Sequence, residues 1–283
     1  MSRRPEAATV VFAVLGVLLL TYLGLPLIYL FFRVEWRDII STLSDLRTLR
    51  AVQVSLITSV IATAIMAVLG VPLGYVLARV PFPGRRFVIG FVFVPMVLPP
   101  LVGGILLLLL YGPYGLIGAV AEGFGMALVN SLSGIVLAQV FVAAPYVIIA
   151  SYSAFTAVDV RLEQAAATLG DSQWQIFLRV SLPLAWPGIA AGVTLAWVRT
   201  LGEFGATLVM AYHPNTMPVF LWVQLTGEGL RGALPLALLL LTLAGGVTTA
   251  IYLVRLLPAG VAAVELTKSS PATQRTGGSA EGG

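Results

Sequence analysis

The chain has 283 residues, of which 59% are hydrophobic and 10% are charged, whereas an average soluble domain carries about 25% charged residues. This small number of polar groups is not enough to cover a water-facing surface. The composition therefore excludes a large soluble domain and predicts a polytopic membrane protein. The net charge of +4 says little about partners, because the positions of basic residues matter more than their sum in a membrane protein. The absence of cysteine excludes disulfides, thiolate metal sites and cysteine nucleophiles.

Apolar segments long enough to cross a membrane recur along the chain. A spanning helix needs about 20 mostly apolar residues. Six segments reach this length, at 9–32, 51–78, 87–111, 130–152, 185–212 and 233–257. The first is too long for the apolar part of a signal peptide and has no clear cleavage site, so we expect it to be retained. The sequence therefore predicts an all-α fold with six transmembrane helices.

Three parts make up the predicted organisation of the chain. A short cytoplasmic N-terminus, 1–8, precedes the transmembrane domain, 9–257. The C-terminal segment 258–283 is rich in small and polar residues, which bury little apolar surface, so we predict a largely disordered tail.

Basic residues indicate the orientation, because cytoplasmic loops of membrane proteins are enriched in Lys and Arg. With the N-terminus inside, the inner segments carry ten basic residues and the outer segments carry five. The first outer loop opposes this trend, but it also contains Glu35, Asp38 and Asp45. We therefore predict that both termini are cytoplasmic.

Glycine and proline are frequent inside the predicted spans, for example at Gly70, Pro72 and Gly74. One interpretation is close helix packing, which small residues permit. The other is a kinked, movable helix that lines a pathway, since neighbouring helices can satisfy the freed backbone groups.

The residue inventory argues against enzymatic chemistry. The only lysine, Lys268, has no glycine-rich loop before it, so a phosphate-binding P-loop is excluded. The only histidine is His213, which excludes zinc sites and haem ligation that need two histidines. We predict no catalytic residue, no metal site, no cofactor in this chain and no nucleic-acid partner.

A polar stretch at 159–183 interrupts the hydrophobic sequence between the fourth and fifth spans. Apolar residues at helical spacing predict a short amphipathic helix at about 160–169, with Asp159 as its N-cap. Gly170 suits the left-handed position that ends a helix. Ser172, followed three residues later by glutamine, has the pattern of a capping box. A second short helix is expected to follow.

The second helix of this stretch is expected to end at Pro183, and Pro187 suits the first turn of the next span. The first interpretation of the helix pair is a helix lying on lipid headgroups, which usually carries basic residues on its polar face. Here two arginines stand against three acidic residues, which suits anionic lipid poorly. The second, which we favour, is a projection that fits a groove on a partner protein.

At these residues the sequence resembles the permease subunits of binding-protein-dependent ABC importers. Their pattern is E-A-A, three residues, G, nine residues, I, one residue, L-P. Here it falls on Gln164, Ala165, Ala166, Gly170, Val180, Leu182 and Pro183. Glutamine replaces the usual glutamate and valine the usual isoleucine, and Glu163 directly before the pattern is a candidate replacement for the charge. The segments "SLITSVIATAIMAVLGVPLGYVLARVPFPGRR" and "VPMVLPPLVGG" resemble the second and third spans of the molybdate and sulfate branch.

This resemblance implies the partners and the mechanism. In that family the polar loop docks in a cleft of a separate ATPase subunit, so the loop would couple ATP hydrolysis to transport. The resemblance implies two copies of the permease, two ATPase subunits and an extracytoplasmic oxyanion-binding protein, in the inner membrane. Closure of the ATPases would switch the permease pair between outward-open and inward-open states.

The fifth predicted span contains a pair of charges. Arg199 and Glu203 are four residues apart, so they are expected to share a helix face, and Thr207 continues that stripe. A charged residue in a membrane usually faces the protein interior and pairs. One interpretation is a structural ion pair, and the other is an element of the translocation pathway or its gate.

The solute is also suggested by resemblance. The segment "RTLGEFGATL" resembles the oxyanion branch, and "AYHPNTMPVFLW" resembles a segment of tungstate and molybdate permeases. We therefore expect molybdate or tungstate, with sulfate as the alternative. A secondary transporter driven by an ion gradient, or an intramembrane hydrolase that uses His213, are the competing classes.

Overall fold

The computed structural model of the chain describes residues 7–246, 248 and 249, and over these residues it contains helices and no strand. The all-α fold class is therefore confirmed. In chain order the helices are α1 (Ala7–Arg33), α2 (Trp36–Ser44), α3 (Leu46–Arg79), α4 (Arg85–Val97), α5 (Pro100–Tyr111), α6 (Leu116–Gly123), α7 (Leu132–Ala157), α8 (Val160–Thr168), α9 (Gln173–Ile176), α10 (Leu182–Leu201), α11 (Gly205–Met210) and α12 (Met217–Glu228). A π-helical turn, Phe177–Ser181, joins α9 to α10, and an apolar helix at Leu230–Gly246 follows α12.

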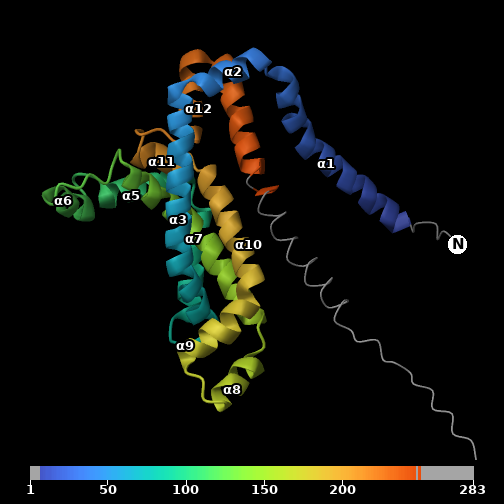
Figure 1. The fold of residues 1–283 in the computed structure, drawn as a ribbon, viewed down its shortest axis with the longest axis vertical. Coiled ribbons are helices and arrows are strands. Elements are labelled where there is room, and N and C mark those ends of the chain that lie inside the picture. The colour runs from blue at the N-terminus through green and yellow to red at the C-terminus, as the bar shows by residue number, and fades with distance from the viewer. Residues whose placement is uncertain (1–6, 247, 250–283) are drawn as a thin grey trace, which may run out of the picture. The chain divides into compact units, whose positions relative to one another are not determined.

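Helices α3, α7 and α10 form the centre of the fold (Figure 1). They pack around a core of small and medium-sized side chains, which includes Ala62 and Met66 of α3, Val147 of α7, and Ile189 and Ala196 of α10. Helix α3 has 34 residues, or about 50 Å at 1.5 Å per residue. Its first turn follows α2 and its last turn reaches α8, so α2 and α8 lie at opposite ends of the bundle (Figure 1).

Glycines let α3 and α10 approach α7 closely. A β-carbon on Gly70 of α3 would lie 3.2 Å from the side chain of Val147. On α10, β-carbons on Gly188 and Gly192 would collide with alanines of α7. Both helices thus carry two small residues four apart, the spacing that allows close approach in membranes. Of the two interpretations of Gly70 and its neighbours, close packing is therefore supported.

The predicted number of six spans is not confirmed over the described residues. Four helices are long and apolar enough to cross a membrane: α1, α3, α7 and the continuous stretch Gln173–Leu201. Helices α4 and α5 would make a fifth as a bent pair. The helix Leu230–Gly246 is shorter, and the rest of the predicted sixth span lies outside the described residues, as do most of the predicted N-terminus 1–8 and the whole tail 258–283.

The predicted third span, 87–111, is not one straight helix. It is divided into α4 and α5, whose axes differ by 110°. Leu98 is extended, with φ −67° and ψ 135°, because a residue before proline is disfavoured in the helical region. Pro99 and Pro100 then leave two successive positions without a backbone N–H, so the first helix ends and a second begins.

The predicted fifth span, 185–212, has the wrong limits. The helix begins earlier, at Gln173, and ends earlier, at Leu201. Pro183, predicted to end the short second helix, instead lies in the first turn of α10. The π-helical turn directly before it widens the helix, so the missing proline N–H and the ring are accommodated without a break.

Candidate functional site

The helix pair at 159–183 forms as the local sequence predicts. The Asp159 carboxylate accepts a hydrogen bond from the Arg161 N–H at 2.9 Å and caps α8. Gly170 ends the helix region at φ +96°, a conformation that residues with a β-carbon rarely adopt. The Gln175 N–H donates to the Ser172 hydroxyl at 3.4 Å, and the Ser172 N–H donates to the Gln175 side chain at 2.7 Å, which completes the capping box.

Glu163 points inward from α8, not toward a partner. Its carboxylate forms an ion pair with Arg79 at the end of α3, at 2.9 Å between Oε2 and Nε. The Ser181 hydroxyl donates to Glu163 Oε1 at 2.8 Å. Arg79 also donates to the Val158 carbonyl at 2.9 Å. Because Glu163 is only 8% exposed, it does not supply the missing outward charge of the E-A-A pattern.

The helix pair exposes small residues together with two large apolar side chains and one amide. Gln164, Ala165 and Gly170 are exposed, and Leu169 and Trp174, close to them in sequence, are 89% and 67% exposed. We call these five residues the docking face. Leu169 and Trp174 thus leave apolar area on the helix pair that no described residue covers.

The other residues of the E-A-A pattern face different surroundings. Ala166 is buried against the bundle, whereas Val180 and Leu182 are half-buried and Pro183 is exposed on the helix leading into α10. The residues of the E-A-A pattern thus fall into two groups. The exposed residues are accessible to a partner, and the buried and half-buried ones connect α8 and α9 to the bundle.

Arg199 and Glu203 form an ion pair, as their spacing suggested, with 2.6 Å between Nη1 and Oε2. They do not share one helix face, because α10 ends at Leu201 and Glu203 follows in the break before α11. Glu203 also accepts the Ala206 N–H at 2.9 Å, which satisfies one N–H in the first turn of α11. Glu203 is 1% exposed, and the side chain of Arg199 is 27% exposed.

Thr207 does not continue the stripe of Arg199 and Glu203, because it lies on the separate helix α11. Its hydroxyl is buried and has no hydrogen-bond partner among the described residues. The predicted stripe requires one continuous helix. The helix instead breaks at Gly202, so Arg199, Glu203 and Thr207 lie on different segments.

Polar links between distant helices could not be found from the sequence. The Trp197 indole N–H donates to Ser59 at 3.0 Å and joins α10 to α3. The Met217 N–H donates to Ser55 at 2.8 Å and joins α12 to α3. The only local signal is that Ser55 and Ser59 are four apart, which places both hydroxyls on one side of α3.

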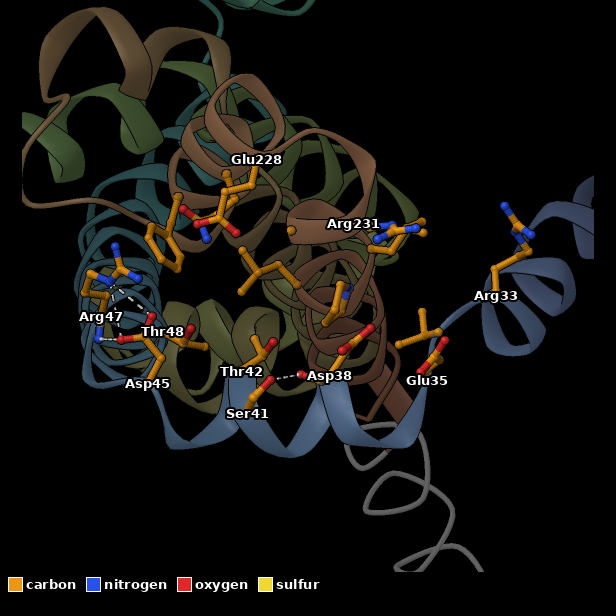
Figure 2. Close-up of a pocket in the computed structure, with 17 residues that line it drawn as sticks. Arg33, Glu35, Asp38, Ser41, Thr42, Asp45, Arg47, Thr48, Glu228 and Arg231 are labelled. Atoms are coloured by element: carbon orange, nitrogen blue, oxygen red, sulfur yellow. Dashed lines mark hydrogen bonds and ion pairs between the residues drawn. The ribbon is translucent and has the colours of Figure 1, made fainter.

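A charged cavity of about 690 Å³ lies at the end of the bundle away from α8. Figure 2 shows acidic and basic side chains of α2, α3, α12 and the following helix around it, among them Asp38, Glu228 and Arg231. Asp45 forms an ion pair with Arg47 at 3.1 Å and caps α3. Both signs of charge line the cavity, so its electrostatics do not select an anion.

His213 has no catalytic arrangement around it. Its ring stands edge-on to Tyr212, with 4.8 Å between ring centroids, and its backbone N–H donates to Asn130 at 3.5 Å. Within the described ranges, no hydroxyl hydrogen-bonds to its imidazole, and no group of three or more His, Cys, Asp or Glu residues is arranged to hold a metal ion.

Curated relatives cover most of the chain. It is 43% identical over 231 residues, 82% of its length, to a probable molybdenum ABC transporter permease protein of Haloferax volcanii, of which it covers 84%. It is 39% identical to the molybdate/tungstate transport system permease protein WtpB of Thermococcus kodakarensis, with 86% of this chain and 94% of the relative covered. The molybdenum transport system permease protein ModB of Mycobacterium tuberculosis is 36% identical, with 80% and 86% covered.

Solved structures share the fold at low sequence identity. A chain of a bacterial alginate ABC transporter in complex with a pentasaccharide-bound periplasmic protein has a TM-score of 0.67 at 16% identity, with 86% of this chain and 92% of that chain covered. A chain of the MetNI methionine ABC transporter in an inward-facing conformation has a TM-score of 0.59 at 18% identity, with 73% and 93% covered.

The family described as "Binding-protein-dependent transport system inner membrane component" matches residues 70–262. This range includes α7, α10, the whole helix pair and the Arg199–Glu203 ion pair. By this match and by its close relatives, the chain belongs to the family of inner-membrane permease components of binding-protein-dependent transport systems.

Proposed function

We propose that this chain is the permease subunit of an ATP-driven importer that moves a tetrahedral oxyanion, molybdate or tungstate, into the cell. The observation that carries this proposal is the helix pair at 159–183, which presents the docking face at one end of a permease fold. The names of the three relatives given above suggest the solute, since they are molybdenum or molybdate/tungstate permeases.

In this proposal the docking face contacts a separate ATPase subunit. Leu169 and Trp174 supply apolar area, while Ala165 and Gly170 let the partner's surface come close. This is the geometry of a short helix entering a groove. Gln164 is exposed on the same face, so the partner meets an amide there in place of the usual carboxylate.

The rest of the proposed assembly consists of a second copy of this chain, two ATPase subunits and an extracytoplasmic binding protein. The helix pair faces the cytoplasm, and both termini are on that side. Solute passes at or near the interface of the two permeases. The ion pair of Arg199 and Glu203, with Thr207 nearby in sequence, is the proposed element of the pathway or gate.

Docking is tested by co-purification with the ATPase subunit. An Ala165→Arg variant and an Ala165→Arg/Gly170→Arg double variant are expected to lose at least 90% of the ATPase recovered, because a long cation replaces a small residue on the docking face (about 1.4 kcal/mol per tenfold in binding). The control is Arg86→Ala, an exposed residue at the same end of the bundle but on α4. Normal recovery with the double variant would contradict the docking role.

Transport is tested in liposomes that contain permease, ATPase and binding protein. ATP hydrolysis is expected to rise when the binding protein carries molybdate or tungstate, and to rise less when it carries sulfate. A larger stimulation by sulfate would replace the proposed solute. Uptake that continues without ATP and collapses with an ionophore would contradict the ATP-driven mechanism altogether.

A further inference from the structure

Three segments that are distant in sequence meet at the Glu163 carboxylate. Arg79 is the last residue of α3, Glu163 lies in the first turn of α8, and Ser181 ends the π-helical turn before α10. We call Arg79, Glu163 and Ser181 the Glu163 cluster. It lies on the side of α8 that faces the bundle, whereas the docking face is on the exposed side.

Both oxygens of the carboxylate are engaged, and little of the cluster is open to solvent. Arg79 Nε lies 3.0 Å from Oε1 and 2.9 Å from Oε2, while the Ser181 hydroxyl donates to Oε1 at 2.8 Å. The side chains of Arg79 and Glu163 are 12% and 10% exposed. A salt bridge with so little solvent is screened weakly and leaves a costly unpaired charge when one partner is removed.

Helix α8 has few other attachments. It has nine residues, and only Glu163 and Ala166 among them are buried. A helix this short is marginal without tertiary contacts. The π-helical turn, in contrast, is held by rings: Tyr75 lies edge-on to both Phe155 and Phe177, at 5.1 and 4.9 Å between centroids. The Glu163 cluster is therefore the main polar attachment of α8.

We infer that the Glu163 cluster transmits displacement of α8 into α3 and α10, so that Arg79, Glu163 and Ser181 are positioning residues for energy coupling and not contacts of the ATPase. This inference rests on the proposed function, since it supposes that the ATPase moves α8. On that proposal α8 contacts the ATPase, whereas the proposed gate residues Arg199 and Glu203 lie on α10 and directly after it, so a displacement of α8 has to cross to another helix.

The two helices that receive this displacement are linked again further along. Trp197 of α10 donates to Ser59 of α3 at 3.0 Å, so these helices are tied at two levels. Arg199 follows two residues after Trp197 and holds Glu203 in the break before α11. A shift at the start of α10 thus reaches the ion pair through one continuous helix, Gln173–Leu201.

The test separates attachment of α8 from docking of the ATPase. Hydrogen exchange of the α8 backbone amides is measured on the purified full-length permease without other subunits. ATPase recovery and ATP hydrolysis stimulated by solute-loaded binding protein are measured on the full complex. The variants are Glu163→Gln, which keeps the shape and removes the charge, Arg79→Met, and Ser181→Ala. The control is Arg86→Met, because Arg86 is an exposed arginine at the same end of the bundle that forms no interaction with the described residues.

Glu163→Gln and Arg79→Met are expected to speed exchange in α8 at least tenfold. They are also expected to lower stimulated ATP hydrolysis about tenfold, which corresponds to about 1.4 kcal/mol in activation free energy, while ATPase recovery stays within twofold of the unaltered chain. Ser181→Ala is expected to act in the same direction and less strongly, because it removes one neutral donor. Arg86→Met is expected to change none of the three measurements.

Two results would overturn the inference. If Glu163→Gln left exchange in α8 unchanged, the cluster would not hold α8. If ATPase recovery fell in parallel with stimulated hydrolysis, Glu163 would act in docking. Should the unaltered chain recover no ATPase, the proposed function would fail by itself, and the exchange data would still decide whether the cluster holds α8.

Discussion

Gly74 on α3 faces Ser151 on α7 so closely that a β-carbon on Gly74 would lie 2.5 Å from the β-carbon of Ser151. It would also lie 2.9 Å from the backbone nitrogen of Tyr152. Gly192 of α10 makes a similar approach to Ala150 from another helix. Helix α7 thus packs between α3 and α10. The backbones of these two helices come close to α7 because glycine has no side chain.

Gly74→Val is therefore expected to destabilise the protein. The added side chain cannot be relieved by a rotamer change, because it meets backbone, and overpacking of this kind costs about 1–3 kcal/mol or more. Gly90→Val on α4 is the control, since a β-carbon there meets nothing within 4 Å. The midpoint of thermal unfolding in detergent should fall for the first variant only, and equal midpoints would show that α3 and α7 can separate without cost.

The ion pair of Arg199 and Glu203 is expected to respond unequally to removal of its two partners. Arg199→Met leaves Glu203, which is 1% exposed, as an unpaired buried charge, and such a change costs about 3–5 kcal/mol. Glu203→Gln leaves Arg199, whose side chain is 27% exposed and is therefore less completely enclosed by protein. Thermal unfolding of both variants checks this order, and greater destabilisation by Glu203→Gln would contradict it.

The hydrogen bond from Trp197 to Ser59 is expected to show coupling in a double-mutant cycle. Trp197→Phe and Ser59→Ala should each lower the free energy of unfolding by about 1 kcal/mol, the usual net worth of such a bond. The double variant should lose less than the sum, because the bond can be lost only once. Additive losses would mean that the two side chains contribute independently.

Gly170 is expected to tolerate asparagine better than alanine. There is open space around the position, so only its φ of +96° resists a side chain, and left-handed backbone costs an ordinary residue about 1–2 kcal/mol. Asparagine adopts such conformations more readily. Hydrogen exchange across the α8–α9 turn should rise more in Gly170→Ala than in Gly170→Asn, and the reverse order would show that φ is not the constraint.

The sequence alone determined the features that arise from local chemistry. The caps at Asp159 and Ser172, and the left-handed turn at Gly170, are confirmed, because each depends on residues within one or two turns of the chain. The low content of charged residues also predicted a helical membrane protein. This prediction needs no long-range contact, because apolar composition is a property of the sequence itself and backbone groups in lipid must be hydrogen-bonded within helices.

Only the tertiary structure decided which side chains meet across helices and where apolar runs break. Hydropathy predicts one span over 185–212, whereas α10 ends at Leu201 and the separate helix α11 begins at Gly205, because the Glu203 carboxylate accepts the Ala206 N–H and stabilises the break between them. Glu163 looked like a charge for a partner, yet it is bound to Arg79, 84 residues away in sequence. This contact depends on where α3 and α7 place the two residues in the folded chain, and no local sequence pattern predicts that placement.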